Sequence, residues 1–155
     1  MSEVKLRYNK NGKPTIKGLS FSISHSQNVL VQAFTKNGEI GVDVEYKNSK
    51  RKYLAVAKRY FHPYEHQYLQ SLDKSAAINC FYHLWTAKEA VCKAKGGRLW
   101  YYLADNYLEN SCSGKKKNMV KSIKGLNILQ FNEIKNFSLT IATQFKPEKV
   151  SFIHE

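Results

Sequence analysis

Four charged side chains in the middle of the sequence have the types and spacing that could hold a divalent metal ion beside a phosphate. Asp43 and Glu45 lie two residues apart, so in a β-strand both carboxylates leave the same face. Glu89 and Lys93 lie four residues apart and point the same way from a helix. Carboxylate oxygens suit Mg²⁺, which takes few protein carboxylates and completes its shell with water and phosphate. Each pair alone could equally be a solvated strand end or an exposed ion pair.

A strand and a helix must position these groups, and the sequence predicts both. Val29–Thr35 and Ile40–Glu45 flank the dipeptide Asn37-Gly38, which is a strong signal for a β-hairpin. Leu19–Ser24 alternates apolar residues with serine, as a half-buried strand does. Phe81–Gly96 carries apolar residues at helical spacing, contains no proline and ends in glycine, so it predicts one amphipathic helix.

The remaining segments complete the prediction of a mixed fold. They favour helices over residues 51–61 and 63–72 and strands over residues 123–131, 137–144 and 150–153. Residues 110–118 are rich in serine, glycine and lysine, which is typical of a mobile loop. Because no repeat or linker divides the chain, we expect one α+β domain over residues 1–155, with helices packed on an antiparallel sheet.

The composition indicates a basic protein of a reducing compartment. The net charge is +13, from 25 lysines and arginines against 12 acidic residues, so the surface should attract polyanions or acidic protein partners. Three cysteines without metal-ligand spacing disfavour a disulfide framework. The sequence has no signal-peptide pattern and no apolar run that could span a membrane. These features predict a soluble cytoplasmic protein.

Five segments of the sequence together resemble the motifs of the 4′-phosphopantetheinyl transferase superfamily. Its two signature motifs are similar to GVDVE at residues 41–45 and WTAKEAVCK at residues 85–93. Three more segments resemble the longer, surfactin-synthetase-activator type: the turn at residues 12–14, FSISHS at residues 21–26 and AKRYFHPYE at residues 57–65. The resemblance implies a phosphopantetheinyl transferase-like half domain, similar to the C-terminal half of that type.

The resemblance also implies a reaction and a set of site residues. The family transfers the phosphopantetheine arm of coenzyme A, with Mg²⁺, to a serine of an acyl or peptidyl carrier protein and releases 3′,5′-ADP, in fatty acid or secondary metabolite biosynthesis. Carried over by position, the metal ligands are Asp43, Glu45 and Glu89, the catalytic residues are Glu89, Lys93 and Glu65, and the coenzyme A-binding residues are Lys13, Ser24, His25, Lys88 and Lys93.

The sequence departs from the family pattern at two places. The longer type has a whole similar half before the segment that FSISHS resembles, where this chain has about twenty residues. We therefore expect a homo-oligomer or a partner chain to complete the coenzyme A cleft, since symmetric self-association is common. The second departure is Arg98, which stands where the family has the second glycine of its motif. If that glycine needs a positive φ, the local turn has moved.

Three alternatives remain beside the transferase. The chain could be a catalytically impaired module of the same fold that only binds coenzyme A or a carrier protein. It could be a basic nucleic-acid binder, because tyrosine and lysine are interleaved over residues 50–60. The H-x-x-E-H pattern of His62–His66 is used by some zinc peptidases, but Pro63 places His62 at or before the start of the helix, so we do not favour zinc.

Overall fold

A computed structural model describes residues 6–108, 121–131 and 134–145 of the chain. The strands are β1 (Arg7–Tyr8), β2 (Pro14–Thr15), β3 (Ser20–Ser26), β4 (Val29–Thr35), β5 (Ile40–Tyr46), β6 (Lys121–Ile123), β7 (Leu126–Phe131) and β8 (Phe137–Thr143). The helices are α1 (Tyr53–Tyr60), α2 (Pro63–Ser71), α3 (Lys74–Lys95) and α4 (Trp100–Leu103). The predicted α+β class is confirmed.

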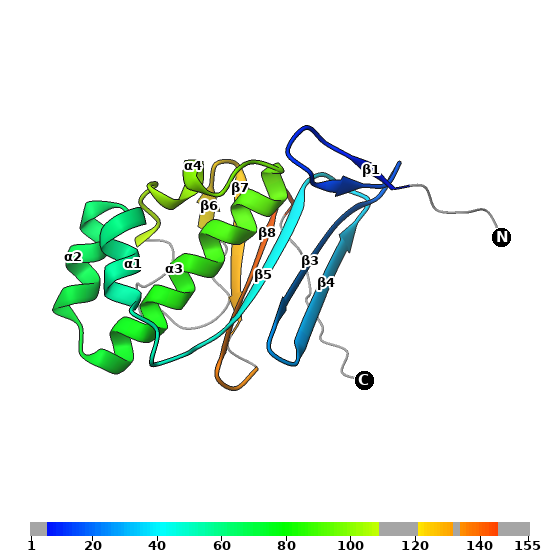
Figure 1. The fold of residues 1–155 in the computed structure, drawn as a ribbon. Helices are drawn as coiled ribbons and strands as arrows, with labels where there is room; N and C mark the ends of the chain where they lie inside the picture. The colour runs from blue at the N-terminus through cyan, green and yellow to red at the C-terminus, as the bar shows by residue number, and fades with distance from the viewer. Residues whose placement is uncertain (1–5, 109–120, 132–133, 146–155) are drawn as a thin grey trace.

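A four-stranded antiparallel sheet and the long helix α3 form the centre of the fold. The strand order is β5-β8-β7-β6, and α3 lies across the β5 and β8 side of the sheet (Figure 1). The β3–β4 hairpin lies beside β5, and the helices α1 and α2 lie near the N-terminal end of α3 (Figure 1). Strand β5 therefore runs between the hairpin and the helix, which places its side chains at a junction of three elements.

Alternation along β5 divides the core into two parts. Val42 and Val44 are almost completely buried in a cluster with Leu129 and Leu139 of the sheet and Ala33 of the hairpin. A second cluster, on the other face of the sheet, is formed mainly by α3 with the shorter helices. Because successive side chains of a strand point to opposite faces, the positions that alternate with the two valines, Gly41, Asp43 and Glu45, face α3.

Two predicted boundaries are wrong for identifiable physical reasons. The long helix begins at Lys74, seven residues before the predicted start, because the Asp73 side chain caps it by accepting hydrogen bonds from two backbone N–H groups. The strand predicted over residues 123–131 is two strands, β6 and β7. Their turn is formed by Lys124 and Gly125, both with positive φ, and this turn signal was not recognised. The loop predicted at residues 110–118 and the strand at residues 150–153 lie outside the described residues.

The cysteines do not all stay reduced, as their odd number had suggested. Cys80 is disulfide-bonded, whereas Cys92 is a free, buried thiol. The odd number of cysteines is therefore no argument for a reducing compartment. None of the helices in the described parts of the chain has the length and hydropathy needed to cross a membrane.

Candidate active site

Gly41 allows α3 to lie directly against β5. A Cβ atom at this position would lie 2.0 Å from the Ala90 carbonyl oxygen and 2.4 Å from the Ala94 nitrogen, so no side chain fits between strand and helix. Asp43 and Glu45 follow Gly41 at steps of two and therefore share its face. The close approach brings the carboxylate-bearing face of the strand against the helix.

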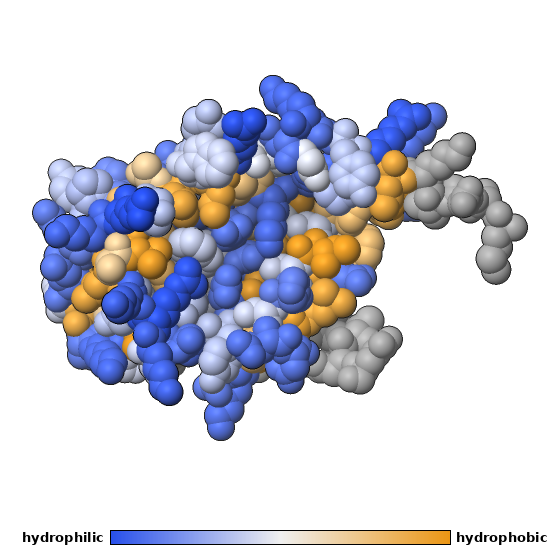
Figure 2. Space-filling model, viewed as in Figure 1, coloured by the Kyte–Doolittle hydropathy of each residue, from blue (hydrophilic) through white to orange (hydrophobic). Residues whose placement is uncertain are grey.

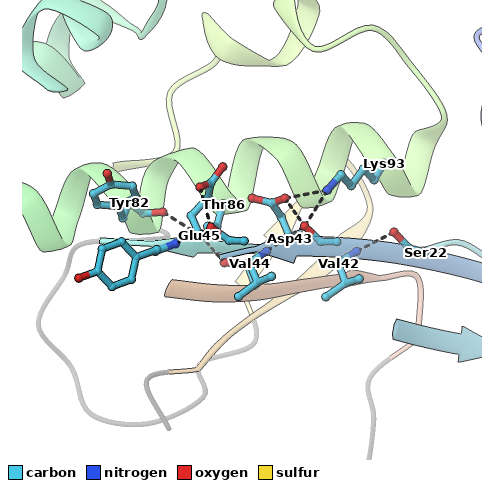
Figure 3. Close-up of polar contacts among 12 residues, drawn as sticks. Ser22, Val42, Asp43, Val44, Glu45, Tyr82, Thr86 and Lys93 are labelled. Atoms are coloured by element: carbon cyan, nitrogen blue, oxygen red, sulfur yellow. Dashed lines mark hydrogen bonds and ion pairs between the residues drawn. The ribbon is translucent and has the colours of Figure 1, made fainter. Parts of the chain in front are cut away.

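Glu89 and Lys93 immediately precede Ala90 and Ala94 on α3, so the same approach carries them to the acids of β5. The Lys93 Nζ lies 2.7 Å from the Asp43 Oδ1 and donates to the Ser24 Oγ at 3.1 Å. Figure 3 shows Lys93 reaching down from the helix to Asp43 on the strand below. The structure thus brings together Asp43, Lys93 and Ser24, which the sequence predicted to share a site.

A buried hydroxyl cluster fixes the position of α3 over the neighbouring strand. The Thr86 Oγ1 lies 2.8 Å from the Thr140 Oγ1 and 3.2 Å from the Ser138 Oγ, both on β8. Thr86 also donates to the Tyr82 carbonyl oxygen one turn earlier in the helix. Gly41 sets how closely α3 approaches the sheet, and the Thr86 contacts set where α3 lies over β8. Together they fix the positions of Glu89 and Lys93.

Three serines of β3 attach the hairpin to the open edge of the sheet. Their Oγ atoms accept backbone N–H hydrogen bonds from β5: Ser22 from Val42 at 3.0 Å, Ser24 from Val44 at 3.2 Å and Ser26 from Tyr46 at 2.9 Å. Two of these hydroxyls also donate to site acids, Ser24 to Asp43 at 2.9 Å and Ser26 to Glu45 at 3.4 Å. We call this contact the serine ladder. The serine ladder covers the free edge of β5 and also orients the carboxylates of Asp43 and Glu45.

The sequence reasoning did not predict the roles of Gly41, Thr86, Ser22 and Ser26. The signal for the ladder was present, because serine recurs at every second position from Ser20 to Ser26. A polar row of this kind normally indicates a solvent-facing strand. Here its hydroxyls satisfy the unpaired N–H groups of the neighbouring strand.

The acids of the site are held in an electrostatically unfavourable environment. Burial raises the pKa of Asp43 to about 6, while Lys93 acts in the opposite direction. Burial, followed by the charge of Asp43, raises the pKa of Glu89 to about 7. Glu45 contributes to both increases. The three carboxylates therefore feel one another's charge, and additional positive charge among them would be stabilising.

The residues present fit a hard divalent cation, although they do not enclose one. The Asp43 Oδ2 is buried without a hydrogen-bond partner, and its neighbours Glu45 and Glu89 offer further carboxylate oxygens, the donors that Mg²⁺ prefers. Among the described residues, no group of three His, Cys, Asp or Glu side chains is arranged to hold a metal ion. Lys93 lies against the other oxygen of Asp43 and supplies positive charge there.

Two cavities open on either side of the Asp43–Lys93 pair. One, of about 320 Å³, is lined by Lys93, Cys92 and the Gly96–Gly97 turn, with Lys13 and Ile23 opposite. The other, of about 300 Å³, is lined by Glu45, Ser26, Lys50 and Arg51, among others. An extended substrate with phosphates in its middle could occupy both and pass the acids between them.

Lys13 and His25 lie at the first cavity or close to it. The Lys13 Nζ donates to the carbonyl oxygens of Ala94 at 2.8 Å and Ile40 at 3.3 Å, and burial lowers its pKa. Lys13 thus fastens the β1–β2 loop to the end of α3. His25 is exposed and shares a strand face with Ile23, which lines the same cavity.

Glu65 and Lys88 form a separate ion pair in the core. Their charged atoms lie 3.0 Å apart and both side chains are 0% exposed. Lys88 also donates to the Asp105 carbonyl oxygen and lies over the rings of Phe61 and Tyr107. These contacts give the pair a structural role. The roles that the resemblance implies, catalysis for Glu65 and coenzyme A binding for Lys88, stay predictions.

Arg98 does not disturb the turn that follows α3. Gly96 has a φ of 60° and ends the helix in the left-handed conformation, which is the usual task of glycine at this position. Arg98 is not among the described residues with positive φ, and its guanidinium lies 6.0 Å from the Trp100 ring centroid. The family's glycine is therefore dispensable for the backbone conformation at this residue.

The fold brings the carboxylates of β5 and the lysine of α3 together on one face of the sheet. The family model described as "4′-phosphopantetheinyl transferase superfamily" matches residues 39–143. The match includes β5, α3 and most of the site, and the chain belongs to this superfamily. The family predicted from the five motifs is confirmed.

Similar relatives carry the same family name. The chain is 38% identical over 100 residues to the 4′-phosphopantetheinyl transferase HetI of Nostoc sp.. The aligned region covers 61% of this chain and 42% of HetI. The chain is 37% identical over 98 residues to Sfp of Bacillus subtilis, 61% of this chain and 42% of Sfp. It is 28% identical over 110 residues to AcpT of Salmonella typhi, 68% of this chain and 57% of AcpT. The chain thus spans about half the length of these relatives.

Proposed function

We propose that the chain is a 4′-phosphopantetheinyl transferase that moves the 4′-phosphopantetheine arm of coenzyme A to a serine of an acyl or peptidyl carrier protein. The observation that carries the proposal is the meeting of Asp43 on β5 with Lys93 on α3, with Glu45 and Glu89 within electrostatic range. Membership in the superfamily and the names of the relatives support the same reaction.

The chemistry requires charges of both signs at this place. The hydroxyl oxygen of the carrier serine attacks the phosphorus that bears the pantetheine arm, the bond to the other phosphate breaks, and 3′,5′-ADP leaves. Lys93 stabilises negative charge that develops on the pyrophosphate. Glu89 can accept the proton of the serine hydroxyl, since a carboxylate at the reacting centre can act as a general base.

Magnesium is part of the proposal. Asp43, Glu45 and Glu89 would hold Mg²⁺, which would neutralise charge on the pyrophosphate and so assist departure of 3′,5′-ADP. The buried, unpartnered Asp43 Oδ2 supports this assignment. Ser24 and Ser26 orient the carboxylates of Asp43 and Glu45 through the serine ladder.

The first cavity is the proposed place of the nucleotide end of coenzyme A. Lys13 and Lys93 line it, and the hydroxyl of Ser24 and the exposed His25 lie close by. These groups can donate hydrogen bonds to phosphate oxygens. Lys13 would keep its bonds to the end of α3 while its charge faces the ligand.

The partners follow from surface charge and apolar exposure. A net charge of +13 favours an acidic carrier protein. The outer face of the β3–β4 hairpin exposes Ile23, Leu30 and Phe34, and Figure 2 shows hydrophobic residues over this region. We propose that a second copy of the chain covers this face and completes the coenzyme A cleft, which sedimentation or sizing can test. The cytoplasmic location stays a prediction.

The decisive experiment incubates the protein with coenzyme A, Mg²⁺ and several apo carrier proteins. We expect at least one carrier to gain the mass of one phosphopantetheine arm, and an equal amount of 3′,5′-ADP to appear. The variant Asp43→Ala should abolish transfer while its circular dichroism spectrum stays that of the wild type. A wild-type protein that binds coenzyme A but modifies no carrier would contradict the proposal, and normal turnover by Asp43→Ala would remove the metal assignment.

A further inference from the structure

Arg51 is a cation of the site region that none of the recognised motifs includes. It lies between β5 and α1, and its guanidinium carbon is 4.7 Å from the Trp85 ring centroid and 5.5 Å from that of Phe81. The two rings are stacked 6.0 Å apart on successive turns of α3, so they form one surface for the guanidinium. A guanidinium held over aromatic rings can still donate hydrogen bonds from its N–H groups.

Those donors have no partner in the described part of the chain. The lysines that form ion pairs there, Lys88, Lys93, Lys95 and Lys124, each reach a carboxylate. None of the ion pairs or side-chain hydrogen bonds among the described residues uses the Arg51 guanidinium. A planar cation that is held by two rings and has free donors is pre-organised to bind a carboxylate or a phosphate in two-point geometry.

The location of Arg51 connects it to the site acids. Phe81, Trp85, Glu89 and Lys93 follow one another at steps of four along α3 and so form one row on its surface. Arg51 lies over the first two members, and Glu89 follows Trp85 one helical turn further along the same row. Glu89 therefore has a cation on each side along the row.

Arg51 also lines the cavity of about 300 Å³ that contains Glu45, together with Lys50, Ser26 and Tyr82. This cavity lies on the opposite side of the Asp43–Lys93 pair from the one lined by Lys13. One carboxylate and two cations in the same hollow favour a ligand with negative charge. Within the described part of the chain, Glu45 is the one acidic side chain that lines it.

We propose that Arg51 binds an anionic group of a substrate in the cavity beside Glu45, either a phosphate of coenzyme A or a carboxylate of the carrier protein. The inference rests on the proposed transferase function and adds a substrate-positioning residue to it. Arg51 makes and breaks no covalent bond. It fixes the substrate through its planar donors, while Trp85 and Phe81 fix Arg51.

The first test compares Arg51→Gln with the matched control Arg59→Gln. Arg59 also lies over an aromatic ring, 5.1 Å from the Tyr60 centroid, but it lines neither of the two cavities. Loss of a charge-assisted contact should raise either the Kd for coenzyme A or the KM for the carrier about tenfold or more. A phosphate partner predicts a weaker Kd for coenzyme A in titration calorimetry without carrier. A carboxylate partner predicts an unchanged Kd and a raised KM for the carrier at nearly constant kcat.

The Arg59→Gln variant should leave both constants within twofold of the wild type. Arg51→Lys keeps the charge but lacks the planar fork, so it should recover part of the loss. An Arg51→Gln protein that is folded, by its circular dichroism spectrum, and has unchanged Kd and KM overturns the proposal. Equal losses in Arg51→Gln and Arg59→Gln would also overturn it, since a general charge effect would then explain both.

The second test needs no variant and so does not depend on the folding of one. Wild-type protein is treated with the arginine reagent phenylglyoxal, and the rate of modification at each arginine is followed by peptide mass. Coenzyme A or the apo carrier should slow modification of Arg51 and leave that of Arg59 unchanged. Equal rates at Arg51 with and without both substrates would overturn the inference. Absence of transfer by the wild type would instead count against the proposed function, while protection of Arg51 can still be measured.

Discussion

Two lysines of α3, five residues apart in sequence, form ion pairs of opposite character. Lys88 pairs with Glu65, and both oxygens of this carboxylate also accept backbone hydrogen bonds, from Tyr107 at 2.7 Å and His62 at 3.2 Å. Lys93 pairs with Asp43, whose second oxygen has no partner. The first pair is completely enclosed and its acid is saturated, whereas the second retains unused capacity to bind.

The difference separates a saturated ion pair from one that can still accept a further partner. A buried ion pair is tolerated when every lone pair and proton is satisfied, and Glu65 meets this condition. Asp43 does not, and Glu45 and Glu89 add like charge around it. Such an arrangement costs stability in the free protein, and a ligand that supplies positive charge would recover that cost.

The largest effect on stability should come from the core pair. Lys88→Met leaves the Glu65 carboxylate buried without its cation, so the free energy of unfolding should fall by about 3–5 kcal/mol. Urea denaturation followed by circular dichroism measures this. The double variant Lys88→Met with Glu65→Gln should recover much of the loss, because the uncompensated charge is gone. A single variant as stable as the wild type would show that the pair is not a structural element.

The lysine of the site should show the reverse behaviour. Lys93→Ala should lower kcat/KM about a hundredfold or more, because it removes positive charge at the pyrophosphate. Its free energy of unfolding should change by about 1 kcal/mol or less, since Lys93 is 31% exposed and Asp43 can take up a proton in its place. Transfer assays and urea denaturation on the same preparation compare the two effects. If Lys93→Ala instead lost much stability and little kcat/KM, Lys93 would have the structural role that is assigned to Lys88.

Glu89 should be a residue that destabilises the metal-free protein. Its folded-state pKa, about 7, lies above the ordinary value of 4.5, so the protonated form is favoured by folding. The resulting stabilisation is fully present below pH of about 4.5 and is lost as the pH rises through about 7. At pH 8 without Mg²⁺, Glu89→Gln should therefore be more stable than the wild type by about 1–2 kcal/mol, a figure reduced for partial exposure.

The same comparison at pH 5 supplies the control for Glu89. There the wild-type carboxyl is largely protonated and resembles the amide, so the gain from Glu89→Gln should nearly vanish. Urea denaturation at both pH values, with and without Mg²⁺, gives the four free energies. A variant that is less stable than the wild type at pH 8 without the metal would contradict the unfavourable environment assigned to this carboxylate.

The sequence predicted on which faces four charged side chains lie, but not the contacts that support them. Spacing alone placed Asp43 and Glu45 on one strand face and Glu89 with Lys93 on one helix face, because these periods are local properties of the backbone. It could not predict that Lys88 and Glu65 enclose each other in the core. That contact joins α2 to α3 across a distance that depends on how the helices pack. The serine row of β3 can be seen in the sequence, but its partners cannot. They are backbone N–H groups, which every residue except proline has, so no residue type indicates where the serines bind.

The smallest expected effect distinguishes the two ways in which β5 is held at its edges. On one side β5 pairs with β8 through backbone hydrogen bonds, and on the other its N–H groups reach the serine ladder. Ser22 accepts from Val42 and, unlike Ser24 and Ser26, is bonded to no site acid. Ser22→Ala should therefore cost about 1 kcal/mol of stability.

Amide hydrogen exchange makes the Ser22→Ala prediction specific to one bond. Exchange at Val42 should become faster because its N–H loses the hydroxyl acceptor, while Val44, which Ser24 still holds, should keep the wild-type rate. Faster exchange along the whole of β5 would mean that the hairpin has detached as a unit. The ladder would then be cooperative, and Ser22 would contribute to the orientation of Asp43 although it does not touch it. Unchanged exchange at Val42 would show that water can replace the serine, and that the packing of Ala33 against the sheet holds the hairpin.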